Sequence, residues 1–308
     1  MEPKTLHILT GPTAVGKTEL SLKWAEQYDA EIVSCDSLLF YRGMNIGTAK
    51  PRADERARVP HHLIDIHQPD SAMTIADYVA RAERSVADIV TRGKRVLVTG
   101  GSGFYLKAFF GPVVDGVTMP TALREQIEAK LTNEGLASLL RELKELNPAG
   151  LGSLDMANPR RVTRALERCL ASGKTLQVLK AEFDALPGVF SEFQIKGVCL
   201  IREPEELNQR IEQRVDGMLA AGLVAEVRGL LDQGLSNNPS AARSIGYRET
   251  IAMLAGELPE GELPAAIVKN TKALVRKQRT WFRTQLPKLR MQVAAEAKSA
   301  TLFDTSTI

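Results

Sequence analysis

The sequence predicts an α/β protein with a parallel sheet core of the P-loop type, flanked by helices and interrupted by a small all-helical insertion. Over the first 115 residues, short apolar runs alternate with helical periodicity, as in strands joined by helices. Residues 116–194 contain helical stretches and turn formers but no convincing strand. Strand-like sequence returns at 195–201. We therefore expect a core domain of residues 1–115 and 195–308, with a helical insertion domain of 116–194.

The expected strands are short, apolar and separated by turn formers or helices. They lie at residues 6–10, 30–35, 61–66, 95–99 and 195–201. The helices expected in the first part of the core lie at 19–25, 74–91 and 105–110, and those of the insertion at 123–133, 136–146 and 160–172. From residue 205 onward we expect only helix and loop. A long helix there has an apolar face formed by Leu207, Ile211, Val215, Met218, Leu219 and Leu223.

Composition excludes several classes of protein. The 308 residues are 44% hydrophobic and 25% charged, as in an ordinary globular protein, and the formal net charge of +3 says little about partners. No apolar run approaches the roughly 20 residues of a membrane span, and the N-terminus lacks a signal-peptide pattern. Cys35, Cys169 and Cys199 are scattered, which disfavours a zinc site. We expect a cytoplasmic protein with reduced thiols and no membrane association.

The first expected strand runs directly into a phosphate-binding motif of the form G-x-x-x-x-G-K-[ST], and a helix follows. The motif comprises Gly11, Pro12, Thr13, Ala14, Val15, Gly16, Lys17 and Thr18. Its glycines let backbone N–H groups turn inward, and the helix adds the positive end of its dipole. Lys17 adds a point charge, and the Thr18 hydroxyl can hold Mg²⁺ against phosphate oxygens. The motif predicts polyphosphate binding without saying which polyphosphate.

Two further groups are expected at the same edge of the sheet. Asp36 follows the second strand, and Ser102 lies in the Gly-rich turn 100–103 after the fourth strand, where ligands of open α/β sheets bind. Asp36 can act as a general base, or it can cap the following turn or help to hold Mg²⁺; position alone leaves both open. For Ser102 an N-cap role is favoured over a chemical one.

The C-terminal part carries a stripe of one charge sign. Between Val268 and Arg290 there are eight basic residues and no acidic one, and five of these fall on one helical face: Lys269, Lys272, Arg276, Arg279 and Arg283. Such a stripe indicates a polyanionic partner, with nucleic acid first and an acidic protein second. Trp281 and Phe282 within it either pack in the core or stack on a base. Further basic residues occur in the insertion (Arg160, Arg161, Arg164, Arg168) and around 244–247 (Arg243, Arg248), so we expect nucleic acid between the domains.

Seven segments, in chain order, carry a family resemblance: GPTAVGKT at 11–18, DSLLFYRGMNIGTAKP at 36–51, HHLIDI at 61–66, GGSGFYL at 100–106, NPRRVTRALE at 158–167, RSIGYRE at 243–249 and RKQRTWFR at 276–283. Together they resemble the tRNA dimethylallyltransferases, also called tRNA isopentenyltransferases, from about residue 10 to about 283. The resemblance implies transfer of a dimethylallyl group from dimethylallyl diphosphate to the exocyclic N6 amine of the adenine 3′ to the anticodon. The products would be N6-isopentenyladenosine and diphosphate.

The resemblance also implies roles for individual residues. The motif 11–18 and Arg214 would hold the diphosphate, with Mg²⁺ at Thr18, while Asp36 would take the proton from the adenine amine. Ser102 stands where relatives commonly carry Thr, so its hydroxyl is placed near the reacting centre. The anticodon stem-loop of tRNA would contact Asp36, Ser37, Leu38, Leu39, Ser102, Arg124, Arg160, Arg161, Val162, Thr163, Arg164, Arg243, Ser244, Ile245, Gly246, Tyr247, Arg248, Arg276, Lys277, Gln278, Arg279, Thr280, Trp281, Phe282 and Arg283. We expect a monomer.

Two other functions use some of the same features. A small-molecule kinase or nucleotide hydrolase would use the phosphate-binding motif, but it would have no use for the basic stripe. It would also need a Walker-B strand ending in Asp, for which only the strand before Asp36 qualifies. A non-catalytic RNA-binding protein would leave the motif and Asp36 unexplained.

Overall fold

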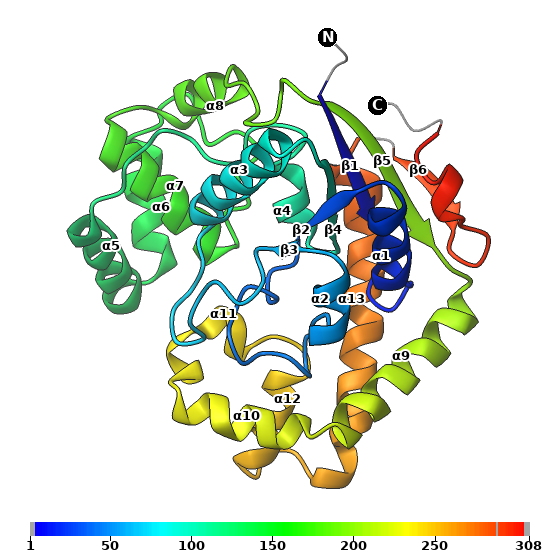
Figure 1. Ribbon diagram of the computed structural model, residues 1–308. Helices are drawn as coiled ribbons and strands as arrows, with labels where there is room; N and C mark the ends of the chain where they lie inside the picture. Colours follow the sequence, from blue (N-terminus) through cyan, green and yellow to red (C-terminus); the bar gives the residue numbers. More distant parts are fainter. Residues whose placement is uncertain (1–3, 288, 305–308) are drawn as a thin grey trace. The chain divides into compact units, whose positions relative to one another are not determined.

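A computed structural model describes residues 4–287 and 289–304 (Figure 1). The chain divides into two compact units. The first unit combines the residues up to Gly111 with those from Gly188 onward, and the second is Pro112–Pro187. The second unit covers most of the predicted insertion 116–194, but it begins earlier and ends before the return to the sheet.

A six-stranded parallel sheet forms the centre of the first unit, which confirms the predicted α/β class (Figure 1). Its order is β3-β2-β4-β1-β5-β6. The strands are β1 (Thr5–Thr10), β2 (Ala30–Ser34), β3 (His61–His62), β4 (Arg95–Gly100), β5 (Gln194–Ile201) and β6 (Arg290–Val293). In register, Leu6 of β1 lies opposite Val96 of β4 and Ile195 of β5. The loops after β1, β2 and β4 therefore meet at one edge of the sheet.

Two strand predictions are wrong. We expected no strand after residue 205, yet β6 pairs in parallel with β5. Its four residues, RMQV, contain two polar side chains and lie at the sheet edge, so they lack the apolar run of an interior strand. The strand expected at 61–66 stops at His62, because Leu63 and Asp65 adopt left-handed backbone conformations with φ of 64° and 56°.

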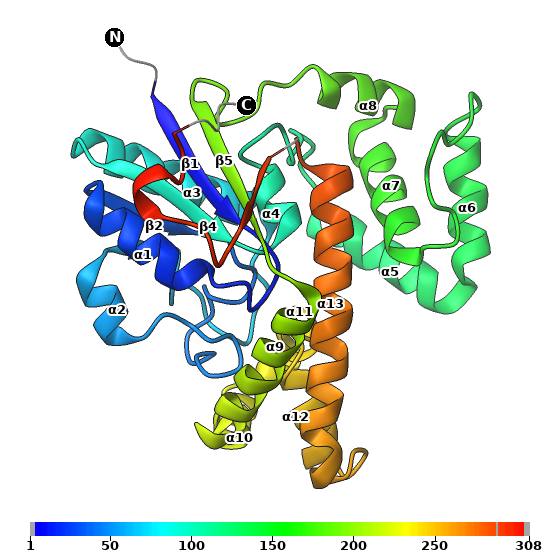
Figure 2. The same cartoon turned by 90° about the vertical axis from the view of Figure 1, so that its right-hand side faces the viewer.

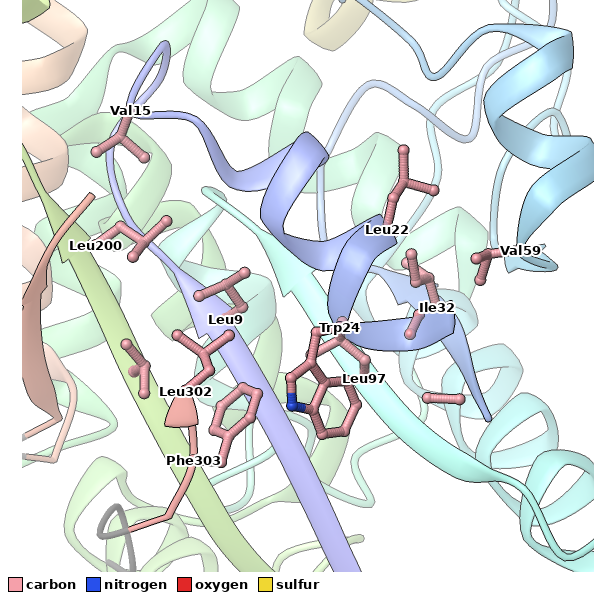
Figure 3. Packing of buried hydrophobic residues seen from close by; sticks show 13 residues of the cluster. Leu9, Val15, Leu22, Trp24, Ile32, Val59, Leu97, Leu200, Leu302 and Phe303 are labelled. Carbon is pink, nitrogen blue, oxygen red and sulfur yellow. The ribbon is translucent and has the colours of Figure 1, made fainter. Parts of the chain in front are cut away.

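Helices α1 (Lys17–Gln27) and α3 (Ile75–Thr91) flank the sheet, with the short helices α2 (Ala53–Arg58) and α4 (Gly103–Lys107) beside them (Figure 1). Trp24 of α1 packs onto Leu9 and Leu97 of the strands, and Phe303 from the C-terminal segment joins the same cluster (Figure 3). Helix α3 matches the helix predicted at 74–91 and buries Val79, Ala82, Val86 and Ile89. Thr74 caps α3 by accepting from the Asp77 N–H. The loop after β1 is thus held between a buried strand and a buried helix.

The remaining helices of the first unit are α9 (Pro204–Ala220), α10 (Leu223–Asp232), α11 (Pro239–Ala242), α12 (Tyr247–Leu254) and α13 (Leu263–Gln285), with 3₁₀ turns at Leu235–Asn237, Glu260–Glu262 and Ser299–Thr301. Helices α9 and α13 run side by side, joined by Leu207, Ile211 and Val275 (Figure 2). The long helix that we expected to include Leu223 ends earlier. Gly222, at φ 97°, breaks it, and Leu223 begins α10.

The second unit contains α5 (Thr121–Glu134), α6 (Leu136–Glu145), α7 (Pro159–Ser172) and α8 (Leu176–Asp184), and its residues 112–187 include no strand. Its own core comprises Ile127, Leu139, Leu143, Val162, Leu166 and Leu179. Helix α8 was not predicted, although Thr175 caps it by accepting from the Val178 N–H. Among the described residues of the chain, no helix is both long and apolar enough to cross a membrane.

Candidate functional site

The phosphate-binding motif forms a tight loop between β1 and α1. Gly11 and Gly16 have φ of 146° and 109°, a region that favours glycine. At Gly11 a Cβ would also lie 2.7 Å from the carbonyl oxygen of Leu200, so the loop needs glycine there to pass β5. Val15 is fully buried and anchors the loop. The N-terminus of α1 opens onto this loop at Lys17, as an anion site requires.

Lys17 occupies the centre of the loop. Its Nζ donates to the carbonyl oxygens of Gly11 at 2.9 Å and Pro12 at 3.0 Å. Burial lowers the pKa of Lys17 to about 8, and the positive charge of Arg214 adds to the lowering while Asp36 opposes it. An arriving anion would favour the charged form of this amine.

Two adjoining cavities open at this edge of the sheet, both within the first unit. The smaller, of about 310 Å³, is lined by polar and charged groups that include Lys17, Thr18 and Arg210. The larger, of about 500 Å³, has a mainly apolar lining that includes Phe104, Met218, Ile267, Leu274 and Trp281. We call them the charged chamber and the apolar chamber. Both are lined by the same four residues, Thr13, Asp36, Thr48 and Arg214.

Asp36 therefore stands where the chambers meet. One carboxylate oxygen, Oδ1, accepts from the Leu38 N–H at 3.0 Å and caps the turn that follows β2. Within the described part of the chain, Oδ2 has no hydrogen-bond partner. The two roles considered for this residue are compatible, because capping uses one oxygen and leaves the other for a ligand.

Ser102 occupies the N-cap position of α4, but its hydroxyl does not cap that helix. Instead, Oγ accepts from the Ser37 N–H at 2.9 Å and donates to Ser37 Oγ at 3.2 Å. The N-cap expected from sequence is thus not formed. Ser102 ties the turn that carries Asp36 to the loop after β4.

Three arginines fix the loops around the charged chamber. Arg214 of α9 donates to the Thr48 carbonyl at 3.1 Å, and burial lowers the pKa of its guanidinium while Asp36 opposes that effect. Arg210, one turn earlier, donates to the Ala14 carbonyl at 2.9 Å. Arg202 donates to the Val15 carbonyl at 3.1 Å. Sequence reasoning did not assign Arg202 to the site, although it follows the end of β5, where ligands of parallel sheets bind.

Helix α13 contributes to the site from the opposite end of the chain. Gln278 Oε1 accepts from the Thr13 N–H at 3.0 Å, and its Nε2 donates to the Gly101 carbonyl at 3.0 Å. The Gln278 amide, expected at the RNA surface, thus joins the phosphate loop to the loop after β4. Trp281 packs on Gly103, where a Cβ would lie 2.2 Å from the indole. Trp281 is half-buried and lines the apolar chamber, whereas Phe282 is buried.

The outer face of α13 carries the basic stripe. Lys269, Arg276, Arg279 and Arg283 are exposed. Lys272 pairs with Glu212 at 2.8 Å. Over the described residues, Arg276, Arg279 and Arg283 have no carboxylate within ion-pair distance. These three charges are available to an external polyanion, and with them lie the exposed Lys277 and Thr280.

Several residues expected to contact RNA have buried side chains. Tyr247 is fully buried, and so is Val162 in the core of the second unit; Thr163 is 8% exposed. Only the backbones of these residues can reach a ligand. Outside α13, the expected contacts with side chains exposed or half-exposed are Asp36, Ser37, Leu38, Leu39, Ser102, Arg124, Arg160, Arg161, Arg164, Arg243, Ser244, Ile245 and Arg248.

Two of the expected RNA contacts in the second unit face an internal carboxylate. Glu167 is nearly fully buried, and it pairs with Arg164 at 2.6 Å and with Arg124 at 3.9 Å. Arg168 pairs with Asp115. Part of the basic cluster on α7 therefore balances buried charge within the unit.

Comparison with known proteins adds to this geometry. The sequence model described as IPP transferase matches residues 39–285. A tRNA dimethylallyltransferase of Opitutus terrae is 60% identical over 300 residues, covering 97% of this chain and 96% of that protein. The tRNA dimethylallyltransferase 1 of Trichlorobacter lovleyi is 40% identical over 306 residues, covering 99% and 98%.

Solved structures are similar over nearly the whole chain. The tRNA isopentenylpyrophosphate transferase of Bacillus halodurans superposes with a TM-score of 0.70 at 30% identity, covering 98% of this chain and 94% of that one. A eukaryotic dimethylallyltransferase acting on tRNA gives a TM-score of 0.78 at 24% identity, covering 98% and 76%, which shows a shared fold.

Proposed function

The chain belongs to the IPP transferase family, and from this we infer that it is an enzyme that transfers a dimethylallyl group to tRNA. We propose that the donor is dimethylallyl diphosphate and that the acceptor is the N6 amine of the adenine 3′ to the anticodon. The observation that carries the proposal is the meeting of a charged and an apolar chamber at Asp36. The donor has a charged and an apolar half, and the reacting carbon lies at their junction.

The charged chamber fits the diphosphate. As the allylic C–O bond breaks, the bond electrons pass to the diphosphate, and the charges of Lys17 and Arg214 stabilise it. Because Lys17 and the three arginines are already held by backbone carbonyls, little reorganisation accompanies this step. The same preorganisation would serve any diphosphate, so the family and the apolar chamber define the donor.

The apolar chamber fits the dimethylallyl group and the adenine. An allylic carbon that loses its leaving group reacts readily with water, so the walls formed by Met218, Ile267 and Trp281 favour transfer by excluding water. The N6 lone pair forms the new C–N bond, and the proton that N6 loses passes to Asp36 Oδ2. For this step the base must leave its stack, which costs a few kcal/mol and requires binding energy from the rest of the RNA.

We propose Mg²⁺ as the cofactor. Thr18 lines the charged chamber, and the described residues include no cluster of three His, Cys, Asp or Glu side chains able to hold a metal. This donor set fits Mg²⁺, which commonly binds through one or two protein ligands together with substrate phosphates and water. When bound, Mg²⁺ would neutralise charge on the diphosphate, and the Thr18 hydroxyl would be its protein ligand.

We further propose that the exposed arginines of α13 and the segment 243–248 bind the anticodon stem-loop. We propose that the enzyme acts as a monomer; in support, all residues that line the two chambers come from one unit of one chain. We also propose a cytoplasmic location, because the proposed substrate is tRNA. A kinase or hydrolase is not favoured, because the relatives covering nearly the whole chain are named for dimethylallyl transfer to tRNA.

The test is incubation with labelled dimethylallyl diphosphate, Mg²⁺ and an unmodified tRNA with adenine 3′ to the anticodon. We expect label in the tRNA, and nuclease digestion should yield labelled N6-isopentenyladenosine. A matched tRNA with guanine at that position should remain unlabelled. ATP turnover without labelled RNA would replace the proposal with the kinase or hydrolase alternative.

A further inference from the structure

Glu226 of α10 has no role in the chemistry described above, yet its carboxylate is unusually well bonded. Oε2 accepts from the backbone N–H groups of Asn45 at 2.9 Å and Ile46 at 2.7 Å. Oε1 accepts from the Gly47 N–H at 3.1 Å and from the Tyr247 hydroxyl at 2.6 Å. Four donors therefore converge on one half-buried carboxylate. Hydrogen bonds to a charged acceptor are the strong ones, so Glu226 fixes three consecutive residues of the loop after β2.

Tyr247 also contacts this loop. The side chain is fully buried, and a Cβ at Gly47 would lie 2.5 Å from its ring. Residue 47 must therefore be glycine for the loop to reach Glu226. Burial and the negative charge of Glu226 both raise the pKa of Tyr247, which keeps its hydroxyl protonated as a donor. Glu226 and Tyr247 together form a clamp on residues 45–47.

The clamped loop leads directly to the charged chamber. Thr48 follows Gly47, and its hydroxyl donates to the Met44 carbonyl at 2.7 Å, closing the turn. Its carbonyl accepts from Arg214 Nη2 at 3.1 Å. Thr48 and Arg214 line both chambers, so the clamp acts on the site through the orientation of one guanidinium.

We propose that Glu226 is a positioning residue for the donor: its carboxylate holds residues 45–47 so that the Thr48 carbonyl orients Arg214 toward the diphosphate. This inference rests on the proposed function for the identity of the donor. Glu226 touches no substrate. Its effect should appear in the binding of the diphosphate and not in the binding of RNA.

The test compares the wild type with Glu226→Gln. Glutamine keeps the shape but places an NH₂ group against two of the four donors, whichever way it is oriented. We expect the KM for dimethylallyl diphosphate to rise about tenfold and the KM for tRNA to stay within about twofold, since misplacing one contact affects mainly its own ligand. Asp232→Asn, which removes an exposed charge from the end of the same helix, should leave both values unchanged.

Two further measurements separate positioning from general destabilisation. Isothermal titration calorimetry measures the binding of inorganic diphosphate, in the presence of Mg²⁺, without any turnover. It should show the same loss of affinity in Glu226→Gln. Tyr247→Phe should lose less affinity for diphosphate than Glu226→Gln. The double variant should lose no more affinity than Glu226→Gln alone, because the hydroxyl acts through the carboxylate. A lower melting temperature with unchanged donor KM and diphosphate affinity would overturn the proposal. A wild type that does not modify tRNA would instead defeat the proposed function, and the diphosphate titration would still test the clamp.

Discussion

Two sets of cations in the first unit differ in how the protein uses them. The inner set donates to backbone carbonyls around the charged chamber and comprises Lys17, Arg202, Arg210 and Arg214. The outer set lies on α13 without ion-pair partners in the described residues and comprises Arg276, Arg279 and Arg283. Buried charges act strongly at short range, whereas exposed charges are screened by salt. Lys17 and Arg214 are the more buried members of the inner set, whereas Arg210 is exposed. Lys17 and Arg214 are therefore suited to a small enclosed anion, and the outer set to an extended one.

The largest effect should come from the group that faces the inner set. In Asp36→Asn the amide oxygen can still accept from the Leu38 N–H, so the turn is kept while the proposed base is lost. We expect kcat to fall by roughly 10²- to 10⁴-fold, measured in single-turnover assays with excess enzyme. Affinity for tRNA, measured by filter binding, should be unchanged. Near-normal turnover would remove Asp36 from the chemistry.

The inner set should also respond to pH. Burial lowers the pKa of Lys17 to about 8, so the lysine is charged below that pH and loses its proton above it. Affinity for dimethylallyl diphosphate, measured without tRNA, should therefore decrease about tenfold for each pH unit above 8. In Lys17→Met we expect weaker binding, by about ten- to 100-fold at pH 7, and no such pH dependence.

A matched change on α1 controls for the loss of charge. Lys23 pairs with Glu19 on the exposed face of that helix, so Lys23→Met should bind the donor with the affinity and the pH profile of the wild type. A wild-type profile that stays flat between pH 7 and 10 would contradict the role given to Lys17.

The outer set should respond to salt. In the double variant Arg276→Gln/Arg279→Gln, we expect weaker tRNA binding and a slope of log K against log[salt] reduced by about one to two, as each lost phosphate contact contributes roughly 0.7–0.9. Donor affinity should not change. Arg81→Gln/Arg84→Gln removes the same charge from the exposed face of another helix, α3, and should leave the slope intact. Equal slopes in all three proteins would mean that α13 does not face RNA.

The smallest effect on RNA binding should come from Arg164, because its charge is already paired with buried Glu167. We expect Arg164→Gln to lower the free energy of unfolding by about 1–3 kcal/mol, measured by urea denaturation, since the carboxylate loses its closest partner. In a Glu167→Gln background the same substitution should change the free energy of unfolding little. Arg161→Gln, an exposed neighbour on α7, should be neutral for stability. An equal loss of unfolding free energy in both backgrounds would show that the Arg164–Glu167 pair does not contribute to stability.

The sequence predicted the layers of the fold because its strong patterns are local. Apolar runs identified β1, β2, β4 and β5, and the periodicity of 74–91 identified α3. Edge strand β6 was missed because its side chains are only partly buried and its apolar and polar residues alternate weakly. The prediction for β3 was too long because left-handed conformations at Leu63 and Asp65 leave no clear sequence signal. Helix α8 was missed because the mixed composition of its segment obscures the helical periodicity of its apolar residues.

The site was predicted only in part, for a different reason. The phosphate motif lies on contiguous residues, so spacing was enough to find it. The bonds from Gln278 to Thr13 and from Glu226 to residues 45–47 join parts of the chain that are far apart in sequence. No periodicity or spacing rule reports such pairs. A lone glutamate on an amphipathic helix looks like any solvated charge until the fold brings four donors to it.

The pairing of β1 bears on how the chain acquires its structure during synthesis. This interior strand is synthesised well before its partners β4 and β5, which begin only at residues 95 and 194. Helices α5 to α7 contact one another locally and can pack sooner. The phosphate loop closes against Leu200 of β5 and is bonded by Gln278 of α13. A nascent chain would therefore carry the whole motif early but complete the proposed diphosphate site only after α13 has emerged.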